Sequence, residues 1–245
     1  MSTYILVPGA WLGEWAWRET AEALRARGHE VHPLSLTGLA ERAVEDGSGI
    51  DLETHIADVI GFIEERDLRD VVLVGHSYSG IVVGAVAHRI GDRLSDVVYV
   101  DSAPFGDGQG MLDLMPPEGA DEMRALVAAG NGWGFPMPGR DALGEASSIL
   151  GLTDEHFKLF GELATPHPFG TYEQRLSLRG EPAGSPRPVL IACEDFRMML
   201  DAGNPWLTAL IDPSWLRLDI ATGHWPMLSE PVALAELLDR VAADR

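Results

Sequence analysis

Cysteine is nearly absent from this sequence, since Cys193 is the single one among 245 residues. One cysteine cannot form an intramolecular disulfide, and this composition is typical of a protein from a reducing compartment. Basic residues are also scarce, because 18 Lys and Arg stand against 38 Asp and Glu and give a formal charge of −20. A chain this acidic repels polyanions. We therefore expect no nucleic-acid partner and no binding to anionic membrane surfaces.

Long hydrophobic runs are missing as well. The first residues, MSTYILVPGA, carry no basic segment ahead of their apolar run, and that run is too short for a signal peptide or a membrane helix. We expect a soluble cytoplasmic protein. Internal repeats and low-complexity tracts are also absent, and 46% of the 245 residues are hydrophobic. This length and composition favour one globular domain with a sizeable core.

Short β-branched runs alternate along the chain with longer segments whose apolar residues recur at helical spacing. This alternation predicts an α/β fold, with a mostly parallel six-stranded sheet and helices on both faces. The predicted strands are Thr3–Val7, Glu30–Leu34, Val71–Gly75, Asp96–Val100, Pro188–Cys193 and Leu216–Ile220. The predicted helices between and after them are Glu14–Arg27, Asp51–Glu65, Ser79–Ile90 and Pro231–Ala242.

The segment between Val100 and Pro188 breaks this alternation. It is rich in Gly, Pro, Met and Trp, shows no strand pattern, and carries helical patterns at Ala120–Ala129 and Asp154–Ala164. A structureless loop of this length is uncommon in a compact domain, so we expect a helical cap over one end of the sheet. The predicted organisation is an α/β core of residues 1–102 and 186–245, with a helical cap insertion at 103–185.

The stretch GHSYSG, residues 75–80, joins a predicted strand directly to a predicted helix. Gly75, Ser79 and Gly80 are small enough for a sharp turn, which pushes the hydroxyl of Ser77 out of the packed layer. Ligands of α/β sheets bind beyond the carboxyl ends of the strands, where this serine lies. The helix that follows aims free N–H groups at any anion formed nearby. The pattern is typical of a nucleophile elbow.

A serine nucleophile needs a base near neutral pKa, and the base needs a partner that holds its tautomer. The stretch ACEDF puts Asp195 just past the fifth strand, and ATGHWPML puts His224 just past the sixth. The order Ser, Asp, His is the one that an elbow serine on this kind of sheet uses. Two other acids stay open as the partner of His224: Glu194 beside Asp195, and Asp101 in VYVDSAP at the end of the fourth strand.

Four motifs along the chain are ILVPGAWLGEWAW at 5–17, GHSYSG at 75–80, CED at 193–195 and GHWPMLSEP at 223–231. Together they resemble the α/β-hydrolase fold family, specifically its compact branch of plant methylesterases, hydroxynitrile lyases and bacterial esterase-like hydrolases. The resemblance implies that Ser77 is the nucleophile, His224 the general base and Asp195 the acid that orients it. It also implies an oxyanion hole formed by the backbone N–H groups of Ala10 and Tyr78.

Some positions depart from the family pattern. Ser79 stands where the elbow usually has glycine, and the first loop reads PGAW where many relatives have His-Gly. Plant hydroxynitrile lyases carry glutamate before the nucleophile and lysine after the triad histidine, whereas this chain has His76 and Trp225. The cation that a cyanide leaving group requires is therefore missing, and the pattern resembles the esterases.

The resemblance implies a serine hydrolase that cleaves a small, largely apolar ester, lactone or thioester through an acyl-enzyme. Three alternatives stay open. One is a lyase or other non-hydrolytic reaction on the same triad, and another is a small-molecule receptor with vestigial catalysis. The third is cofactor-free oxygen chemistry by a His-Asp pair.

Five aromatic and sulfur residues are candidates for the substrate pocket, with packing of the cap onto the sheet as the alternative role. They are Trp11, Trp133, Phe135, Met137 and Phe169. No cofactor is expected, and no metal, since the spacing of His29 and His32 matches no zinc signature. The expected partner is a small-molecule substrate. The oligomeric state stays open, with a homodimer as one option.

Overall fold

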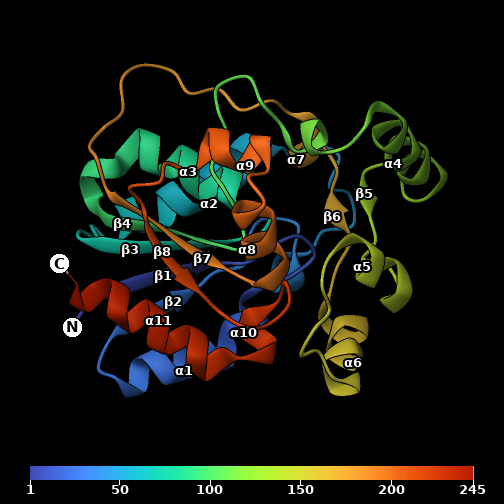
Figure 1. Ribbon diagram of the computed structural model, residues 1–245. Helices are drawn as coiled ribbons and strands as arrows, with labels where there is room; N and C mark the ends of the chain where they lie inside the picture. The colour runs from blue at the N-terminus through green and yellow to red at the C-terminus, as the bar shows by residue number, and fades with distance from the viewer. Residues whose placement is uncertain (245) are drawn as a thin grey trace.

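A parallel sheet lies at the centre of the computed structural model, which describes residues 1–244 (Figure 1). Within those residues the sheet has six strands in the order β2-β1-β3-β4-β7-β8, and every neighbouring pair is parallel. The strands are β1 (Thr3–Val7), β2 (Glu30–Pro33), β3 (Val71–His76), β4 (Leu94–Val100), β7 (Arg187–Ala192) and β8 (Leu216–Asp219). They correspond to the strands expected from the sequence, so the predicted fold class is confirmed.

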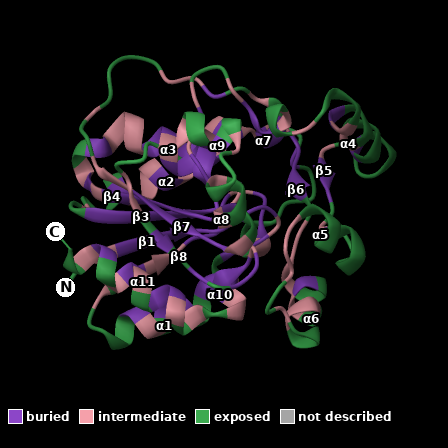
Figure 2. Cartoon of the chain, viewed as in Figure 1, coloured by how far each residue is buried: buried purple, intermediate pink, exposed green. Residues whose placement is uncertain are grey.

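Strand β1 shows how the sheet divides the core into two layers. Its side chains alternate, so that Tyr4 and Leu6 join one apolar cluster while Ile5 and Val7 join the other. Helices pack on both clusters, and their outer faces are exposed while the sheet is buried (Figure 2). Helices α1 (Arg18–Ala26) and α11 (Pro231–Ala243) cover the Tyr4 face, and α2 (Leu52–Glu65) and α3 (Ser79–Ile90) cover the other.

Short helices complete the core. The predicted helix at 14–27 is a 3-10 turn, η1 (Glu14–Trp17), followed by α1. Between β7 and β8 the chain forms α8 and α9, which the sequence pattern did not predict. The remaining short elements of the core are η2 (Ala40–Arg42), η3 (Gly91–Arg93), α8 (Glu194–Asp201), α9 (Pro205–Leu210) and α10 (Pro226–Ser229).

The insertion, residues 103–185, places its helices and short strands at one end of the sheet, away from the chain termini (Figure 1). Its last residues run back over the core to the end of α3, where the N–H of Ala183 donates to the carbonyl of His88. The elements of the insertion are η4 (Met111–Leu114), α4 (Pro117–Ala129), β5 (Gly134–Phe135), α5 (Arg140–Ala146), α6 (Asp154–Leu163), β6 (His167–Pro168) and α7 (Gly170–Glu173). Strands β5 and β6 pair antiparallel, whereas the sequence gives no strand pattern there. Two residues per strand are too few for side-chain alternation to become visible. No helix within residues 1–244 combines the length and apolarity needed to span a membrane.

Gly80, in the first turn of α3, marks how closely this helix approaches the end of β4. A Cβ at Gly80 would lie 2.1 Å from Ser102 Oγ and 2.5 Å from the carbonyl oxygen of Ala103. We expect Gly80→Ala to lower the free energy of unfolding by about 1–3 kcal/mol, because the helix must shift to relieve the overlap. Urea denaturation measures this change.

Gly61 in α2 provides the matched control, because a Cβ there meets no atom within 4 Å. Gly61→Ala should raise the free energy of unfolding by up to about 1 kcal/mol, since alanine has the better helix propensity. Equal effects of the two substitutions would contradict the close packing of α3 on β4.

Candidate active site

Ser77 lies at the sharp corner between β3 and α3. Its backbone φ is 51°, in the left-handed region that residues other than glycine rarely adopt. The turn is crowded, because a Cβ at Gly75 would lie 2.7 Å from a methyl group of Val83. The N–H of Ser77 donates a hydrogen bond of 3.2 Å to the carbonyl of Val100 at the end of β4. The surrounding packing therefore holds the serine in a strained and defined position.

Two further serines hold the backbone of this corner. The hydroxyl of Ser79, the residue that replaces the usual elbow glycine, donates to the carbonyl oxygen of Pro8 in the loop after β1. The hydroxyl of Ser102 donates to the carbonyl oxygen of Ser77 at 2.5 Å. The departure from glycine thus adds a tether between the elbow and the neighbouring loop.

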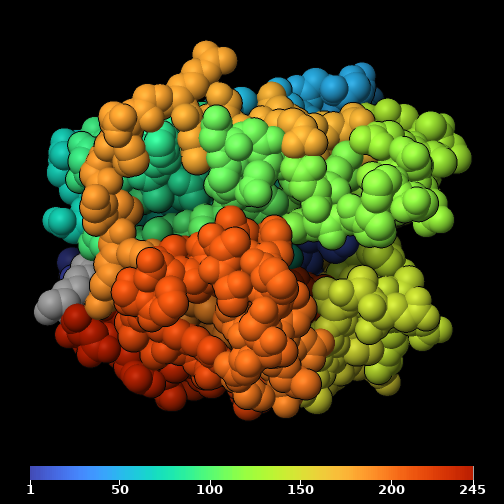
Figure 3. Space-filling model, turned by 45° about the horizontal axis from the view of Figure 1, so that its top comes forward, coloured from blue at the N-terminus to red at the C-terminus, as the bar shows by residue number. Residues whose placement is uncertain are grey.

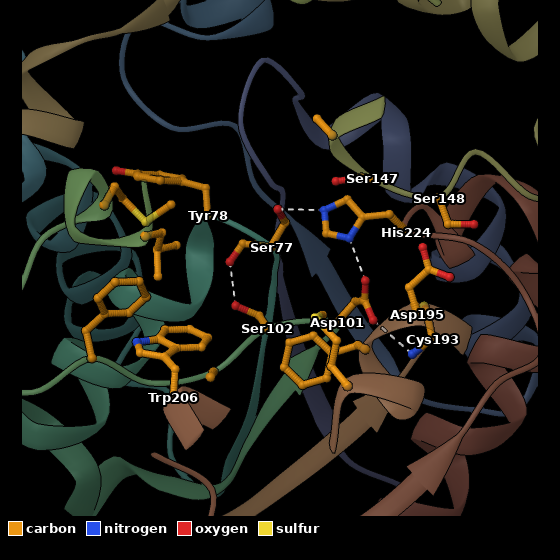
Figure 4. A pocket seen from close by; sticks show the side chains of 17 residues that line it. Ser77, Tyr78, Asp101, Ser102, Ser147, Ser148, Cys193, Asp195, Trp206 and His224 are labelled. Atoms are coloured by element: carbon orange, nitrogen blue, oxygen red, sulfur yellow. Dashed lines mark hydrogen bonds and ion pairs between the residues drawn. The ribbon is translucent and has the colours of Figure 1, made fainter. Parts of the chain in front are cut away.

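His224, in the loop between β8 and α10, bridges Ser77 and a carboxylate (Figure 4). Its Nε2 lies 2.8 Å from Ser77 Oγ, and its Nδ1 lies 2.5 Å from Asp101 Oδ2. A carboxylate only accepts hydrogen bonds, so Nδ1 carries the proton and Nε2 is free to accept the serine hydroxyl. The N–H of His224 also donates to the carbonyl of Ser148 at 2.8 Å, which ties its loop to the insertion.

The structure corrects the expectation that Asp195 orients His224, because the hydrogen bond to Nδ1 goes to Asp101. Asp101 directly follows β4, is 8% exposed and has a left-handed φ of 47°. Its Oδ1 accepts from the N–H of Cys193 at 2.9 Å, and its own N–H donates to Ile191 at 2.8 Å. Both carboxylate oxygens are therefore engaged, and the group is fixed between β4 and β7.

Asp195 lies elsewhere because helix α8 begins at Glu194, directly after β7. Asp195 therefore falls in the first helical turn, where its side chain is exposed at the cavity wall, and no hydrogen bond joins it or Glu194 to His224 within residues 1–244. A local signal for Asp101 does exist. Aspartate tolerates the left-handed conformation better than most residues, and it follows a fully apolar strand end in VYVDSAP.

His76, the last residue of β3, hydrogen-bonds to the backbone of His224. Its Nε2–H donates to the carbonyl oxygen of His224 at 2.7 Å, and the two rings lie 4.8 Å apart. Burial and the neighbouring His224 hold the pKa of His76 well below its usual value. His76 is therefore neutral, and it fixes the backbone of the bridging histidine without adding charge.

The predicted oxyanion donors belong to two different elements near Ser77. Ala10 belongs to the loop after β1, and Tyr78 follows Ser77 as the N-cap of α3. Within the described chain, residues 1–244, neither backbone N–H donates a hydrogen bond. Tyr78 lines the cavity beside Ser77, and Ala10 is not among the described residues that line it.

A buried group of aromatic and imidazole rings surrounds the side chain of Tyr78. The Tyr78 hydroxyl bonds to His55 Nδ1 at 2.8 Å, and its ring lies 4.5 Å from that of His167 and 5.6 Å from that of Tyr172. His55, Tyr78 and His167 are all 0–1% exposed. Burial lowers the pKa of His55 to about 4 and that of His167 well below its usual value, and it raises the pKa of Tyr78.

A cavity of about 340 Å³ opens beside Ser77 and His224. It lies where three segments meet: the chain after β4, the region of α5, and helices α8 and α9 (Figure 3). Apolar side chains form much of its wall, namely Ala103, Phe105, Met111, Leu114, Ala146, Phe196, Met199 and Trp206. In the close-up, Trp206 lies on one side of Ser77, and Ser147, Ser148 and Asp195 lie on the other side, beyond His224 (Figure 4).

The five side chains predicted for the pocket are not among the described residues that line this cavity. Trp11 Nε1 donates to the carbonyl of Phe135 at 3.2 Å, and the Trp11 and Phe169 rings each pack edge-on against Phe135. Trp133 lies over Gly47, and Met137 packs on the cluster of the Tyr4 face. These residues attach the insertion to the core, which was the alternative role considered for them.

The sequence did not single out the apolar residues of the cavity wall, for a physical reason. They come from short helices and loops, in which neither alternation nor helical spacing shows which side chains face the site. Among residues 1–244, no group of three or more His, Cys, Asp or Glu side chains is arranged to hold a metal ion. Buried Cys193 borders the cavity, and burial together with nearby Asp101 raises the pKa of its thiol.

Comparison with known proteins gives a consistent set of relatives. The sequence profile of the alpha/beta hydrolase family matches residues 4–237. A carbendazim-hydrolyzing esterase from a Nocardioides species is 32% identical over 253 residues, covering 97% of this chain and 98% of its own. Methylesterase 10 of Arabidopsis thaliana is 24% identical over 264 residues, covering 98% and 91%.

Solved structures show the same fold. An extracellular alpha/beta-hydrolase from a Paenibacillus species superposes with a TM-score of 0.79 at 22% identity, covering 98% of each chain. Tomato methylketone synthase I superposes with a TM-score of 0.71 at 17% identity, covering 99% of this chain and 98% of its own. At these identities the structures establish the architecture.

The buried histidines make stability depend on pH in a defined direction. His55, His76 and His167 have pKa values lowered by folding, so the unfolded chain binds more protons as the pH falls. Stability should therefore decrease below pH about 6.5, the pKa of an unperturbed histidine, by about 1 kcal/mol per pH unit for each of them. We expect the free energy of unfolding in urea to be lower at pH 5.5 than at pH 7.5.

A His55→Asn variant is the control, and its stability should fall less steeply over the same interval. Equal wild-type stability at the two pH values would contradict the burial of these three side chains in neutral form.

Proposed function

This chain belongs to the alpha/beta hydrolase family, and we propose that it is a serine esterase whose catalytic triad is Ser77, His224 and Asp101. One observation carries the proposal: a single imidazole reaches a strained serine hydroxyl at 2.8 Å and a buried carboxylate at 2.5 Å, beside a cavity. This arrangement activates a serine for attack on a carbonyl carbon.

The first half of the proposed reaction acylates the enzyme. Ser77 Oγ attacks the ester carbonyl while His224 Nε2 takes the hydroxyl proton. Asp101 keeps Nδ1 protonated and stabilises the imidazolium that forms. His224 then gives the proton to the departing alcohol, and the acyl group remains on Ser77.

Two backbone donors complete the proposed machinery. The N–H groups of Ala10 and Tyr78, which have no acceptor within residues 1–244, bind the oxyanion of the tetrahedral intermediate. The start of α3 lies directly behind this position and favours negative charge. In the second half, His224 activates a water molecule that releases the acid from Ser77.

The relatives support an ester as the substrate class. The Nocardioides relative is named for hydrolysis of carbendazim, and the Arabidopsis relative is named a methylesterase. The cavity of about 340 Å³ is near the lower end for small-molecule sites, and its wall is largely apolar. We therefore propose a small, largely apolar ester as substrate, with lactones and thioesters of similar size open to the same chemistry.

The charges around the cavity favour neutral esters within this substrate class. No lysine or arginine is among the described residues that line the cavity, while Asp195 and Asp101 border it. The chain also carries a net charge of −20. An ester with a free carboxylate would meet repulsion from both sources, so neutral esters are the better substrates.

The nucleophile can be tested without knowing the natural substrate. Treatment with a small fluorophosphonate should add one adduct to the wild-type protein, detected by intact mass, because the reagent reacts with activated serines. Ser77→Ala should show no adduct and should lose several powers of ten in kcat on a neutral aryl ester. A Ser79→Ala variant is the matched control and should still react, since its hydroxyl only tethers a loop.

An adduct that persists in Ser77→Ala would identify another nucleophile. Undiminished ester turnover by that variant would refute the proposed mechanism.

The orienting acid is tested by a pair of substitutions. Asp101→Asn should lower kcat by about a thousandfold to ten-thousandfold, because the amide favours the wrong tautomer of His224. Asp195→Asn should lower kcat on a neutral ester less than tenfold, roughly the effect of a changed cavity wall. Steady-state kinetics on one aryl acetate measures both variants, and a larger loss for Asp195→Asn would overturn the assignment of Asp101.

A further inference from the structure

The loop that carries Ala10 is held by the insertion through the peptide group of the next residue. The Trp11 N–H donates to His167 Nδ1 at 3.2 Å, and the N–H of Thr165 donates to the Trp11 carbonyl at 3.1 Å. Trp11 also has a left-handed φ of 66°, a conformation that needs support from its surroundings. His167 is 0% exposed, so the acceptor side of this bond is shielded from water.

Tyr78, the residue that carries the other predicted oxyanion donor, is also held by a buried histidine. The Tyr78 hydroxyl lies 2.8 Å from His55 Nδ1, while His55 Nε2 lies 2.9 Å from the carbonyl oxygen of Thr37. Because a carbonyl can only accept, His55 carries its proton on Nε2, and its Nδ1 accepts from the Tyr78 hydroxyl. The side chain of Tyr78 is thereby fixed between α2 and the insertion.

His167 has the same tautomer for an analogous reason. Its Nδ1 accepts from the backbone of Trp11, so its proton is on Nε2, which donates to Thr171 Oγ1 at 3.0 Å. The Thr171 hydroxyl donates onward to the carbonyl of Pro168 at 2.8 Å. Every donor in this series of hydrogen bonds has an acceptor. The two histidine rings lie 5.8 Å apart, and both contact the Tyr78 ring.

From these contacts we propose that His55 and His167 are positioning residues for the oxyanion hole, each acting as a neutral acceptor at Nδ1. His167 holds the Trp11 peptide and so fixes Ala10, and His55 holds the Tyr78 side chain and so fixes its backbone N–H. This inference rests on the proposed function. Neither histidine touches the substrate, and both act through the residues they bind.

The physical reason is the geometric demand of oxyanion stabilisation. Backbone donors must already point at the oxyanion position before charge develops, because reorganising them during the reaction costs the energy they would supply. Ala10 and Tyr78 lie on two separate elements, the loop after β1 and the start of α3. The shared buried cluster of His55, Tyr78 and His167 connects these elements, in addition to the tether from the Ser79 hydroxyl to the carbonyl of Pro8.

The acceptor role of His167 is tested with two variants of similar size. His167→Asn keeps an acceptor at the position of Nδ1, whereas His167→Leu removes it. We expect kcat to fall about ten- to hundredfold in His167→Leu, less than the loss of an oxyanion donor outright, and to fall less than about threefold in His167→Asn. KM should change less than twofold in both. Fluorophosphonate titration counts the competent sites, so kcat is expressed per titrated site and misfolded protein does not contribute.

His55 is tested in parallel with His55→Leu, His55→Asn and Tyr78→Phe. His55→Leu and Tyr78→Phe remove opposite ends of one hydrogen bond, so each should lower kcat, and the double variant should lose no more than the worse single variant. His55→Asn retains an acceptor and should recover most of the activity. A second readout is the inhibition constant of a trifluoromethyl ketone, whose adduct with Ser77 carries an oxyanion. It should rise in proportion to the loss of kcat/KM.

The inference is overturned if the Leu variants keep wild-type kcat per titrated site. Equal losses in the Asn and Leu variants, or an unchanged inhibition constant for the ketone, would also overturn it. The rate at which a fluorophosphonate labels Ser77 distinguishes this inference from the proposed function. During labelling, the phosphoryl oxygen of the reagent binds the same N–H groups of Ala10 and Tyr78, and no ester has to be hydrolysed. If His167→Leu is labelled more slowly than the wild type and than His167→Asn, the positioning role is supported even if no ester is hydrolysed. Turnover of esters with unchanged labelling in all variants supports the esterase and refutes the positioning role.

Discussion

The two hydrogen bonds of His224 are the interaction on which the arrangement of this site depends. They require three groups from distant parts of the chain to meet within 3 Å of one ring: Ser77 after β3, Asp101 after β4, and His224 after β8. The parallel sheet makes this possible, because all its strands end at the same edge. Strands β3 and β4 are neighbours, so their terminal residues are adjacent before any loop contributes.

Backbone strain at this edge of the sheet includes two residues of the proposed triad. Ser77 and Asp101 both occupy the left-handed region, at 51° and 47°. Each non-glycine residue in such a conformation costs about 1–3 kcal/mol, and it persists only where the surrounding packing allows no alternative. Here the packing comes from the buried strands, from the close approach of Gly80 to Ser102 and Ala103, and from the hydrogen bonds that hold both backbones. The apolar core on both faces of the sheet therefore maintains the geometry of a small polar site.

Histidine serves two distinct purposes around this edge. His224 has access to the cavity and exchanges a proton in the proposed reaction. His55, His76 and His167 are buried neutral, and burial holds their pKa values low. In that form each ring offers one donor and one acceptor in fixed directions, which suits it to hold backbone and hydroxyl groups inside a dry core. Because these histidines must stay neutral in the folded state, protonating them in acid would both unfold the protein and disrupt the site.

The sequence by itself determined the sheet, its strands and the serine and histidine that meet at its edge. Those features depend on local patterns: short β-branched runs between helical segments, the small residues around Ser77, and polar residues directly after strands. The choice between Asp101 and Asp195 could not be made in this way, because both follow a strand and the motif resemblance favoured Asp195. Only the tertiary structure decided it, since β4 lies beside β3 whereas α8 begins at once after β7 and turns Asp195 to the cavity wall. The lining of the cavity was likewise decided by tertiary structure, because its residues come from short segments whose orientation is set by packing against the core and is not encoded in any local periodicity.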